Sequence, residues 1–350
     1  MSYFAGCDYY RLSSHPAVRQ ALCAGLESLG LSVCASRRTT GNHPVYAEFE
    51  RELARWFGAP SALLLASGYM TNLAVAQALA GDVSHVLIDE RAHSSLADGA
   101  RFFDCPVVRF PHRNATRAAA AAQRCGRSAR LILLTDGLFA HSGEVAPLHD
   151  YLRLLPAGAR LLVDDAHGAG VLGRRGRGTA EHLRVPARRL IRTVSLGKAL
   201  GVGGGAVLGP AALCRRIIER SRLFAGHTPL ALPLVAAARA SLRLLSEDFR
   251  MRRRLVLNTG SVKAALRAAG FPVPDGPGPI IAFRAGSRRE AALLAGRLRA
   301  AGVHPPLIQY PGGPAEGYFR FVISSEHTAE QLDTLVDVLL APPRIRALPG

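Results

Sequence analysis

The chain has 350 residues, of which 49% are hydrophobic, and a formal net charge of +18 at pH 7. No stretch reaches the roughly 18–20 uncharged apolar residues of a membrane span, and the N-terminus lacks the basic and apolar regions of a signal peptide, so we expect a cytoplasmic protein. The positive charge comes from 42 arginines spread along the chain and only two lysines, Lys198 and Lys263, which argues against a nucleic-acid partner.

The six cysteines are scattered and form no C-x-x-C pair. In a chain of this length without a secretion signal, this usage favours reduced thiols over a disulfide framework or a zinc site. We therefore expect no metal.

Short apolar runs alternate with segments of helical length through the first two thirds of the chain. The predicted strands are 62–66, 86–89, 107–110, 131–135, 161–164, 193–196 and 206–208, and helices are predicted at 69–80, 115–124 and 148–154. Continuous apolar strands alternating with helices are typical of a mostly parallel sheet covered on both faces. The sequence therefore predicts an α/β fold with a seven-stranded sheet.

The pattern changes after about residue 249. An arginine-rich helical stretch ends near residue 269 and is followed by a Pro- and Gly-rich turn at 271–279. A strand (280–283), a helix (288–301), a strand (318–323) and a helix (328–340) follow. We expect an N-terminal segment over 1–45, a large domain over 46–248 and a smaller α+β domain over 249–343.

Lys198 lies in the segment Thr193-Val-Ser-Leu-Gly-Lys-Ala-Leu-Gly-Val-Gly-Gly-Gly, directly after a predicted strand. Glycines allow backbone N–H groups to converge on an anion, and Ser195 adds a hydroxyl. A Walker P-loop is a poor match because its glycines precede the lysine and a Ser or Thr follows it. A solvated loop is the alternative interpretation.

The segment Leu161-Leu-Val-Asp-Asp-Ala-His-Gly is an apolar strand that ends in two carboxylates and a histidine. A carboxylate at the carboxyl end of a strand is well placed to pair with a cationic ring nitrogen, which a pyridoxal cofactor requires. A metal site, a sugar site or a helix cap are the alternatives for Asp164 and Asp165.

Two more segments suit the same cofactor. Ser67-Gly-Tyr-Met-Thr-Asn follows a strand and opens a helix, whose free N–H groups form a phosphate site, although ordinary capping has the same pattern. His93 follows the next strand and offers a flat ring to lie over a pyridine.

Taken together, these segments resemble the α-oxoamine synthases, which include 8-amino-7-oxononanoate synthase and glycine C-acetyltransferase and are pyridoxal-phosphate enzymes of the aspartate-aminotransferase fold (fold type I). The matching pieces are Gly41 with Phe49-Glu, Ser67-Gly-Tyr-x-Thr-Asn, His93-Ser-Ser-x-x-Asp-Gly, Val163-Asp-Asp-Ala-His-Gly-x-Gly, Gly176-Arg-Gly, Ser195-x-Gly-Lys-Ala-x-Gly-x-x-Gly-Gly, and Arg320 before Ser-Ser-Glu-His-Thr. The resemblance extends over nearly the whole chain.

The resemblance implies a role for each of these residues. Lys198 holds pyridoxal 5'-phosphate as a Schiff base and moves protons at the substrate α-carbon, and Arg320 binds the amino-acid carboxylate. The other cofactor contacts are Asp164 to the ring nitrogen, His93 stacked on the ring, His167 to the phenolic oxygen, and Gly68, Tyr69 and Ser195 to the phosphate. The implied reaction condenses a small amino acid with an acyl thioester, in a homodimer with shared active sites.

The sequence departs from the family mainly where the substrates bind. Phe139-Ala-His-Ser-Gly replaces Phe-Ser-Met-Asp-Gly, which leaves open whether Ser142 takes over from the lost serine at Ala140. Cys7 replaces an asparagine, and the usual histidine before Glu50 is replaced or shifted to Tyr46 or His43. Phe224-Ala-Gly-His-Thr-Pro lacks a serine- or threonine-rich stretch. The N-terminal segment is expected to be truncated relative to the family.

These departures keep other reactions open. The same cofactor on the same fold also serves aminotransferases, aldolases and decarboxylases, and a catalytically silent protein is a further alternative. The amino acid is not specified by the sequence. The acyl donor is either a coenzyme A thioester or an acyl carrier protein, since the basic chain would attract an acidic carrier.

Overall fold

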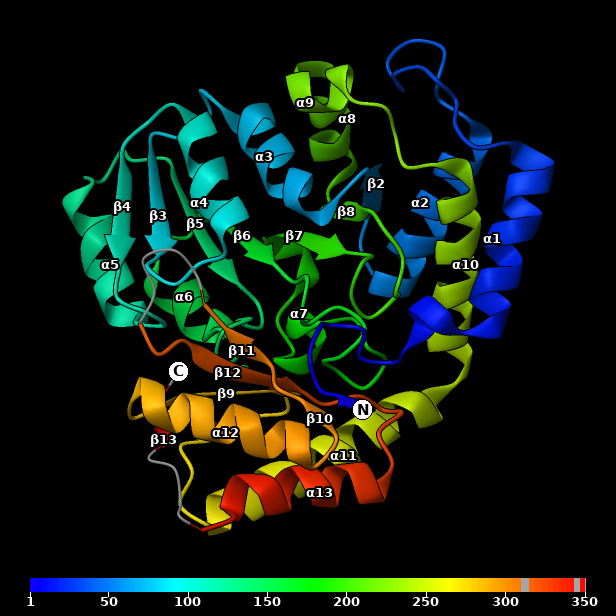
Figure 1. Cartoon of the computed structure of the whole chain (residues 1–350). Coiled ribbons are helices and arrows are strands. Elements are labelled where there is room, and N and C mark those ends of the chain that lie inside the picture. Colours follow the sequence, from blue (N-terminus) through cyan, green and yellow to red (C-terminus); the bar gives the residue numbers. More distant parts are fainter. Residues whose placement is uncertain (310–314, 343–346, 350) are drawn as a thin grey trace. The chain divides into compact units, whose positions relative to one another are not determined.

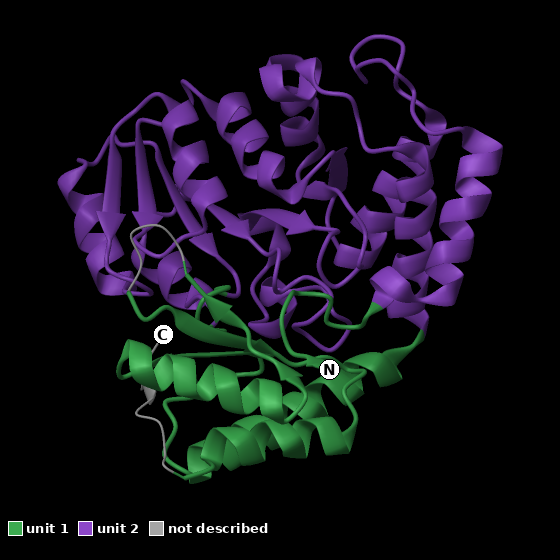
Figure 2. Cartoon of the chain, viewed as in Figure 1, with its two compact units in different colours: residues 1–11, 139–144, 248–350 green, residues 12–138, 145–247 purple. Residues whose placement is uncertain are grey.

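A computed structural model describes residues 1–309, 315–342 and 347–349. The chain divides into two compact units (Figure 2). Unit 1 contains residues 1–11, 139–144 and 248–350, and unit 2 contains residues 12–138 and 145–247. The domain limits expected from the sequence stay a prediction.

Unit 2 is built on a seven-stranded sheet with the order β2-β8-β7-β6-β5-β3-β4 (Figure 1). The strands are β2 (Ser61–Leu65), β3 (His85–Asp89), β4 (Val107–Phe110), β5 (Leu131–Asp136), β6 (Arg160–Asp164), β7 (Leu190–Ser195) and β8 (Gly205–Gly209). Neighbours from β4 to β7 pair in parallel, and only β8 runs antiparallel to the strands beside it. The predicted mostly parallel α/β sheet is confirmed.

The strand register brings the carboxyl ends of the central strands together. Asp136 pairs with Asp164 across β5 and β6, and Asp164 pairs with Thr193 across β6 and β7. Polar residues that are far apart in the sequence therefore meet at one edge of the sheet, where α/β proteins bind ligands.

Ten helices of unit 2 surround this sheet in the described chain. They are α1 (Pro16–Leu29), α2 (Pro44–Phe57), α3 (Gly68–Leu79), α4 (Ser94–Ala100), α5 (Ala115–Arg124), α6 (Leu148–Leu154), α7 (Thr179–His182), α8 (Ala211–Arg220), α9 (Arg222–Gly226) and α10 (Leu232–Glu247). Short 3-10 turns lie at Leu12–Ser14, Arg101–Phe103 and Ala187–Arg189.

Residues that alternate along each strand point to opposite faces of the sheet. Leu63, Val86 and Ile132 share one buried cluster with Val75 of α3 and Ile217 of α8. Their neighbours along the strands, such as Leu64, Leu87 and Leu133, are equally buried, so both faces of the sheet are covered. Burial on two faces explains why these strands are apolar without alternation.

Unit 1 contains a four-stranded antiparallel sheet with the order β11-β12-β9-β13. Its strands are β9 (Ile280–Ala285), β11 (Leu307–Ile308), β12 (Tyr318–Val322) and β13 (Ala347–Pro349). The helices of unit 1 are α11 (Phe249–Ala268), α12 (Arg288–Ala300) and α13 (Ala329–Leu340). A separate pair of short parallel strands is formed by β1 (Ser2–Tyr3) and β10 (Val303–His304). The ring of Phe283 stacks on those of Phe319 and Phe321 at 5.8 and 5.9 Å between centroids. This aromatic contact joins β9 to β12.

No helix in the described residues combines the length and apolar character that crossing a bilayer requires.

Candidate active site

Lys198 lies in the turn that links β7 to β8, at the carboxyl edge of the unit 2 sheet. Gly201 has a φ of +67°, and a Cβ there would lie 2.4 Å from the backbone nitrogen of Ser13, so this position requires glycine. The turn holds the Lys198 carbonyl, which accepts a bond from the Gly201 amide at 2.9 Å. The Lys198 side chain is half-buried and forms no hydrogen bond or ion pair within the described residues.

Gly68 lies close to Ser195 at the start of α3. A Cβ on Gly68 would lie 2.9 Å from the Cβ of Ser195 and 3.1 Å from its hydroxyl. Ser67 caps the helix by accepting a bond from the Met70 amide at 3.3 Å. The first N–H groups of a helix have no intrahelical partner, so those of Gly68 and Tyr69 stay available beside the Ser195 hydroxyl. These groups suit a phosphate, because N–H groups at a helix N-terminus bind anions.

Asp164 ends β6 with only 6% of its surface exposed. Its Oδ1 accepts a hydrogen bond from the Ala166 amide at 3.0 Å, and its Oδ2 accepts one from Asn72 at 2.6 Å. Both bonds orient the carboxylate. A buried, oriented carboxylate is the partner that the ring nitrogen of a pyridoxal cofactor needs.

Asp165 faces a different environment. Its carboxylate accepts bonds from the amide and the hydroxyl of Thr179 at 2.9 and 2.6 Å. Complete burial raises the pKa of Asp165 to about 6, which the bonds from Thr179 partly oppose. Asp165 therefore fastens the loop that leads to Thr179, and the two adjacent carboxylates differ in their surroundings.

His93 precedes α4 and caps it, since its Nδ1 accepts a bond from the Ser95 amide at 3.2 Å. The ring meets that of Tyr69 edge-on, with 6.1 Å between centroids. Burial lowers the pKa of His93, and the charge of Asp164 partly opposes this while Lys198 adds to it. The lysine, the carboxylate and the histidine are thus close enough to influence one another.

His167 lies in the turn after β6 and is 5% exposed. This turn is closed by a bond from the Ala169 amide to the Asp165 carbonyl at 2.8 Å. The structure therefore places His167 at the same sheet edge as Asp164.

Asp136, which ends β5, was not among the predicted site residues. Its Oδ2 accepts a hydrogen bond from the His93 amide at 2.8 Å. Burial raises the pKa of Asp136 well above its ordinary value, and the charge of Asp164 adds to the rise. An acidic residue at the end of a predicted apolar strand was the signal that could have indicated it.

Arg320 lies on β12 of unit 1. Its Nη2 contacts the sulfur of Cys7 at 4.0 Å, and its Nε is buried without a hydrogen-bond partner among the described atoms. A thiol is a weak acceptor, so the guanidinium retains donors for an anion such as a carboxylate.

The residues at which the sequence departs from the family have local partners. Ser142 accepts a bond from the Glu144 amide at 3.3 Å. The hydroxyl of Tyr46, fully buried in α2, donates to the Leu230 carbonyl at 2.8 Å, and His43 caps α2 by accepting from the Val45 amide. Tyr46 and His43 therefore have structural roles in unit 2.

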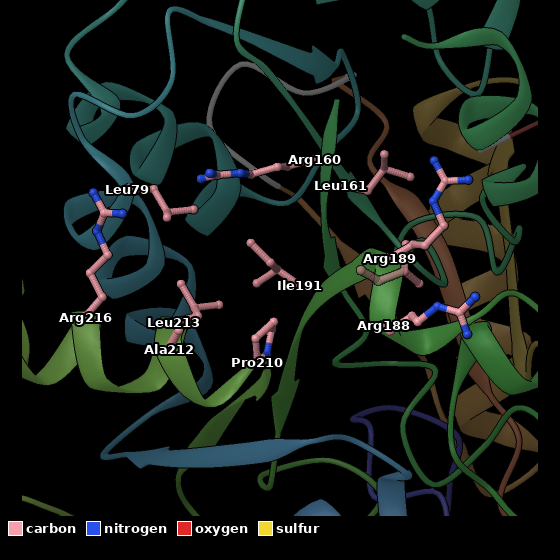
Figure 3. A pocket seen from close by; sticks show the side chains of 11 residues that line it. Leu79, Arg160, Leu161, Arg188, Arg189, Ile191, Pro210, Ala212, Leu213 and Arg216 are labelled. Atoms are coloured by element: carbon pink, nitrogen blue, oxygen red, sulfur yellow. The ribbon is translucent and has the colours of Figure 1, made fainter. Parts of the chain in front are cut away.

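A separate cavity of about 320 Å³ lies at the opposite edge of the same sheet (Figure 3). It is lined by apolar side chains of β6, β7 and α8 and by Arg160, Arg188, Arg189 and Arg216. Arg160 and Arg216 already pair with Asp82. Because arginine is abundant throughout this chain, an arginine rim alone indicates no ligand, and we assign this cavity no role.

Comparisons with known proteins agree with this geometry. The family model for aminotransferase class I and II matches residues 5–339. The 8-amino-7-oxononanoate synthase of Methylococcus capsulatus is 38% identical over 343 residues, which cover 96% of this chain and 87% of that protein. The enzyme of the same name from Xanthomonas axonopodis pv. citri is 35% identical over 349 residues, with 96% and 85% covered.

Solved structures are similar as well. A serine palmitoyltransferase from S. paucimobilis superposes with a TM-score of 0.90 at 26% identity and covers 97% of this chain and 86% of that one. The 8-amino-7-oxononanoate synthase of Francisella tularensis gives 0.84 at 25% identity, with 97% of both chains covered. The chain therefore belongs to the aminotransferase class I and II family, and within it to the α-oxoamine synthases, the acyltransferases that depend on pyridoxal phosphate.

Proposed function

We propose that this enzyme joins a small amino acid to an acyl thioester and releases a 2-amino ketone. The new carbon–carbon bond forms between the amino-acid α-carbon and the acyl carbon, the carbon–sulfur bond breaks with release of the thiol, and the carboxylate leaves as carbon dioxide. The observation that carries the proposal is the buried Asp164 carboxylate, held by Asn72, at the same sheet edge as Lys198.

When bound, the cofactor supplies an electron-withdrawing ring that delocalises the electron pair left at the α-carbon. Asp164 would pair with the ring nitrogen, and His93 would lie over the ring. His167 would donate to the phenolic oxygen. Lys198 would hold the cofactor covalently and then move the proton of the α-carbon, which is supported by an amino group that forms no hydrogen bond or ion pair among the described residues.

The phosphate contacts are proposed for the amides of Gly68 and Tyr69 and for the Ser195 hydroxyl. Their support is the close approach of Gly68 to Ser195, which any larger residue at position 68 would prevent. The substrate carboxylate is assigned to Arg320, whose unpartnered Nε supports a two-pronged contact.

We also propose a cytoplasmic homodimer. All six cysteines are free, as suits a reducing compartment. Sedimentation velocity tests the dimer, and a monomer at micromolar concentration would contradict it.

The donor is either a coenzyme A thioester or an acyl carrier protein. The +18 net charge favours steering of an acidic carrier, and this steering must weaken with salt. The test offers the same acyl group on both donors at low and moderate ionic strength. Faster turnover of the coenzyme A thioester, or rates with the carrier that ignore salt, would contradict carrier docking.

The experiment on the reaction itself is a product assay. Glycine, alanine or serine is supplied with acyl thioesters, and we expect a 2-amino ketone together with equimolar thiol and carbon dioxide. Formation of a 2-oxo acid, of an aldehyde from carbon–carbon cleavage, or of a simple amine without acylation would instead assign an aminotransferase, an aldolase or a decarboxylase.

A further inference from the structure

Asn72 lies behind the site, where its side chain bonds to one polar residue each of β6, β7 and α4, and none of it is exposed. Its Nδ2 lies 2.6 Å from Oδ2 of Asp164 and 2.9 Å from Oγ of Ser95, and its Oδ1 accepts a bond from the Thr193 hydroxyl at 2.7 Å. A carboxylate only accepts hydrogen bonds, so the amide nitrogen must face Asp164. This fixes the orientation of the Asn72 amide.

The Asn72 amide also fixes the direction in which the Ser95 hydroxyl donates its hydrogen. Since Asn72 donates into Oγ, the single hydrogen of the hydroxyl is left for another acceptor. His93 Nδ1 lies 2.8 Å away, whereas Oδ2 of Asp164 lies at 3.4 Å. The shorter contact favours donation from Ser95 to His93.

His93 Nδ1 therefore receives two donors. Besides the Ser95 hydroxyl, the Ser95 backbone amide points at this nitrogen from 3.2 Å. A ring nitrogen that accepts hydrogen bonds carries no proton, so the proton of the neutral ring resides on Nε2.

We propose that Asn72 and Ser95 are positioning residues that connect the Asp164 carboxylate to His93 and hold His93 as the neutral Nε2–H tautomer. The inference rests on the proposed function in one respect, namely that His93 lies over the cofactor ring. An uncharged histidine there adds no positive charge beside a protonated ring nitrogen, so the network maintains the charge pattern that the chemistry needs.

Four neighbouring groups face His93, and two of them influence its protonation. Asp164 on β6 favours the charged ring, and Lys198 and burial oppose it. Asp136 on β5 accepts the His93 amide bond, and the Tyr69 ring packs edge-on. The expected state at neutral pH is the neutral ring.

The test is nitrogen NMR of the full chain with ¹⁵N-labelled histidine, with and without pyridoxal phosphate, over pH 5–9. The His93 signals are assigned by their loss in His93→Gln. We expect the pattern of a neutral ring with hydrogen on Nε2 at pH 7.5 in both samples. A charged ring or an Nδ1–H tautomer of His93 in the unmodified protein would overturn the proposal.

Ser95→Ala tests the hydroxyl. Loss of a donor to Nδ1 makes protonation easier, so the titration midpoint of His93 should rise by roughly 0.5–1 pH unit. Asn72→Ala should produce a smaller rise in the same direction, because Ser95 is then free to turn toward Asp164. An unchanged midpoint in Ser95→Ala would contradict the role of this hydroxyl.

Ser84→Ala is the matched control, because the Ser84 hydroxyl lies 3.1 Å from Nδ1 of His85 outside the site. It should leave the His93 signals unchanged, and a shift equal to that of Ser95→Ala would contradict a local effect. Because the tautomer is read without turnover, a missing 2-amino ketone would refute the proposed function while leaving this result intact.

Discussion

Lys198 and Lys263 are the two lysines of the chain, and their surroundings are opposite. Lys263 is buried in α11 with 2% of its surface exposed, its Nζ donates to the Gly276 carbonyl at 3.0 Å, and burial lowers its pKa to about 8. Lys198 lies in a glycine turn at a sheet edge with a carboxylate and a histidine nearby, and its amine forms no hydrogen bond or ion pair with the described residues.

This contrast shows that a lowered lysine pKa does not by itself identify a nucleophile. If a perturbed pKa were the only criterion, Lys263 would be selected, since a depressed pKa is a property of amines that form Schiff bases. Lys263 donates a hydrogen bond to Gly276, however, whereas the Lys198 amine has no such partner among the described residues. The groups that surround Lys198 are the better guide.

The largest effect should come from Lys198→Ala. Removing the amine that moves the substrate proton should lower turnover by at least about 10³-fold. Lys263→Arg is the control, because it retains a donor in unit 1, and its turnover should remain normal. Product formation under steady-state conditions measures both, and substantial turnover by Lys198→Ala would refute the assignment.

Asp164→Asn should slow exchange of the substrate α-proton by orders of magnitude, roughly 10²-fold or more, while some cofactor binding is retained. The reason is that a neutral amide does not keep the ring nitrogen protonated. Loss of deuterium from α-deuterated substrate measures the rate.

The neighbouring Asp165→Asn serves as its control. It loses a bond to Thr179, so we expect a lower melting temperature and exchange within a few-fold of normal. The reverse result, with normal exchange in Asp164→Asn and little in Asp165→Asn, would move the role to Asp165.

Arg320→Lys should weaken amino-acid binding about tenfold or more and leave cofactor affinity unchanged. Lysine offers a point charge where arginine offers a planar fork, and a hydrogen bond to a charged group contributes about 1.5–3 kcal/mol. Spectral titration with amino acid gives the dissociation constant.

Arg254→Lys is the control, because Arg254 pairs with Glu326 elsewhere in unit 1. This variant should change neither the affinity for the amino acid nor the affinity for the cofactor. Equal losses of amino-acid and cofactor binding in Arg320→Lys would indicate a structural role for Arg320.

The smallest effect concerns Lys263→Met. Below pH 8 the unmodified chain must bury a charged amine when it folds, which lowers its free energy of unfolding. This cost is relieved as pH rises from about 8 toward 10.5, because the unfolded chain then binds more protons than the folded one. At pH 7 the variant should be more stable by about 1 kcal/mol, since loss of the bond to Gly276 offsets part of the gain.

Urea unfolding at pH 7, 9 and 10.5 should show the advantage of the variant falling with pH and reversing by pH 10.5, because a pKa shift of this size corresponds to roughly 3 kcal/mol. A difference that is the same at all three values would contradict a buried, titrating Lys263.

The sheet could be predicted from the sequence because its strands are buried on both faces and end in polar residues. Strand β4 was predicted with its observed bounds, and the others differ by one to three residues at an end. Helix α1 was not predicted; it packs against α10, where a Cβ on Gly25 would come within 2.7 Å of Ala236. Such a contact is not visible in local periodicity.

The network behind the site could be predicted only in part. Asn72 belongs to a segment that indicated a phosphate site, yet its partner Asp164 is 92 positions away. Their contact depends on the position of β6 beside β7 and on the direction of α3, neither of which local patterns specify. The same holds for the bond between the His93 amide and Asp136.

The central claim is that Lys198 carries the cofactor, and reductive trapping tests it directly. The protein is incubated with pyridoxal phosphate, reduced with borohydride, digested and mapped by mass spectrometry. We predict that the phosphopyridoxyl group is found on the peptide containing Lys198 and is lost in Lys198→Ala. Attachment to Lys263 instead would contradict the account.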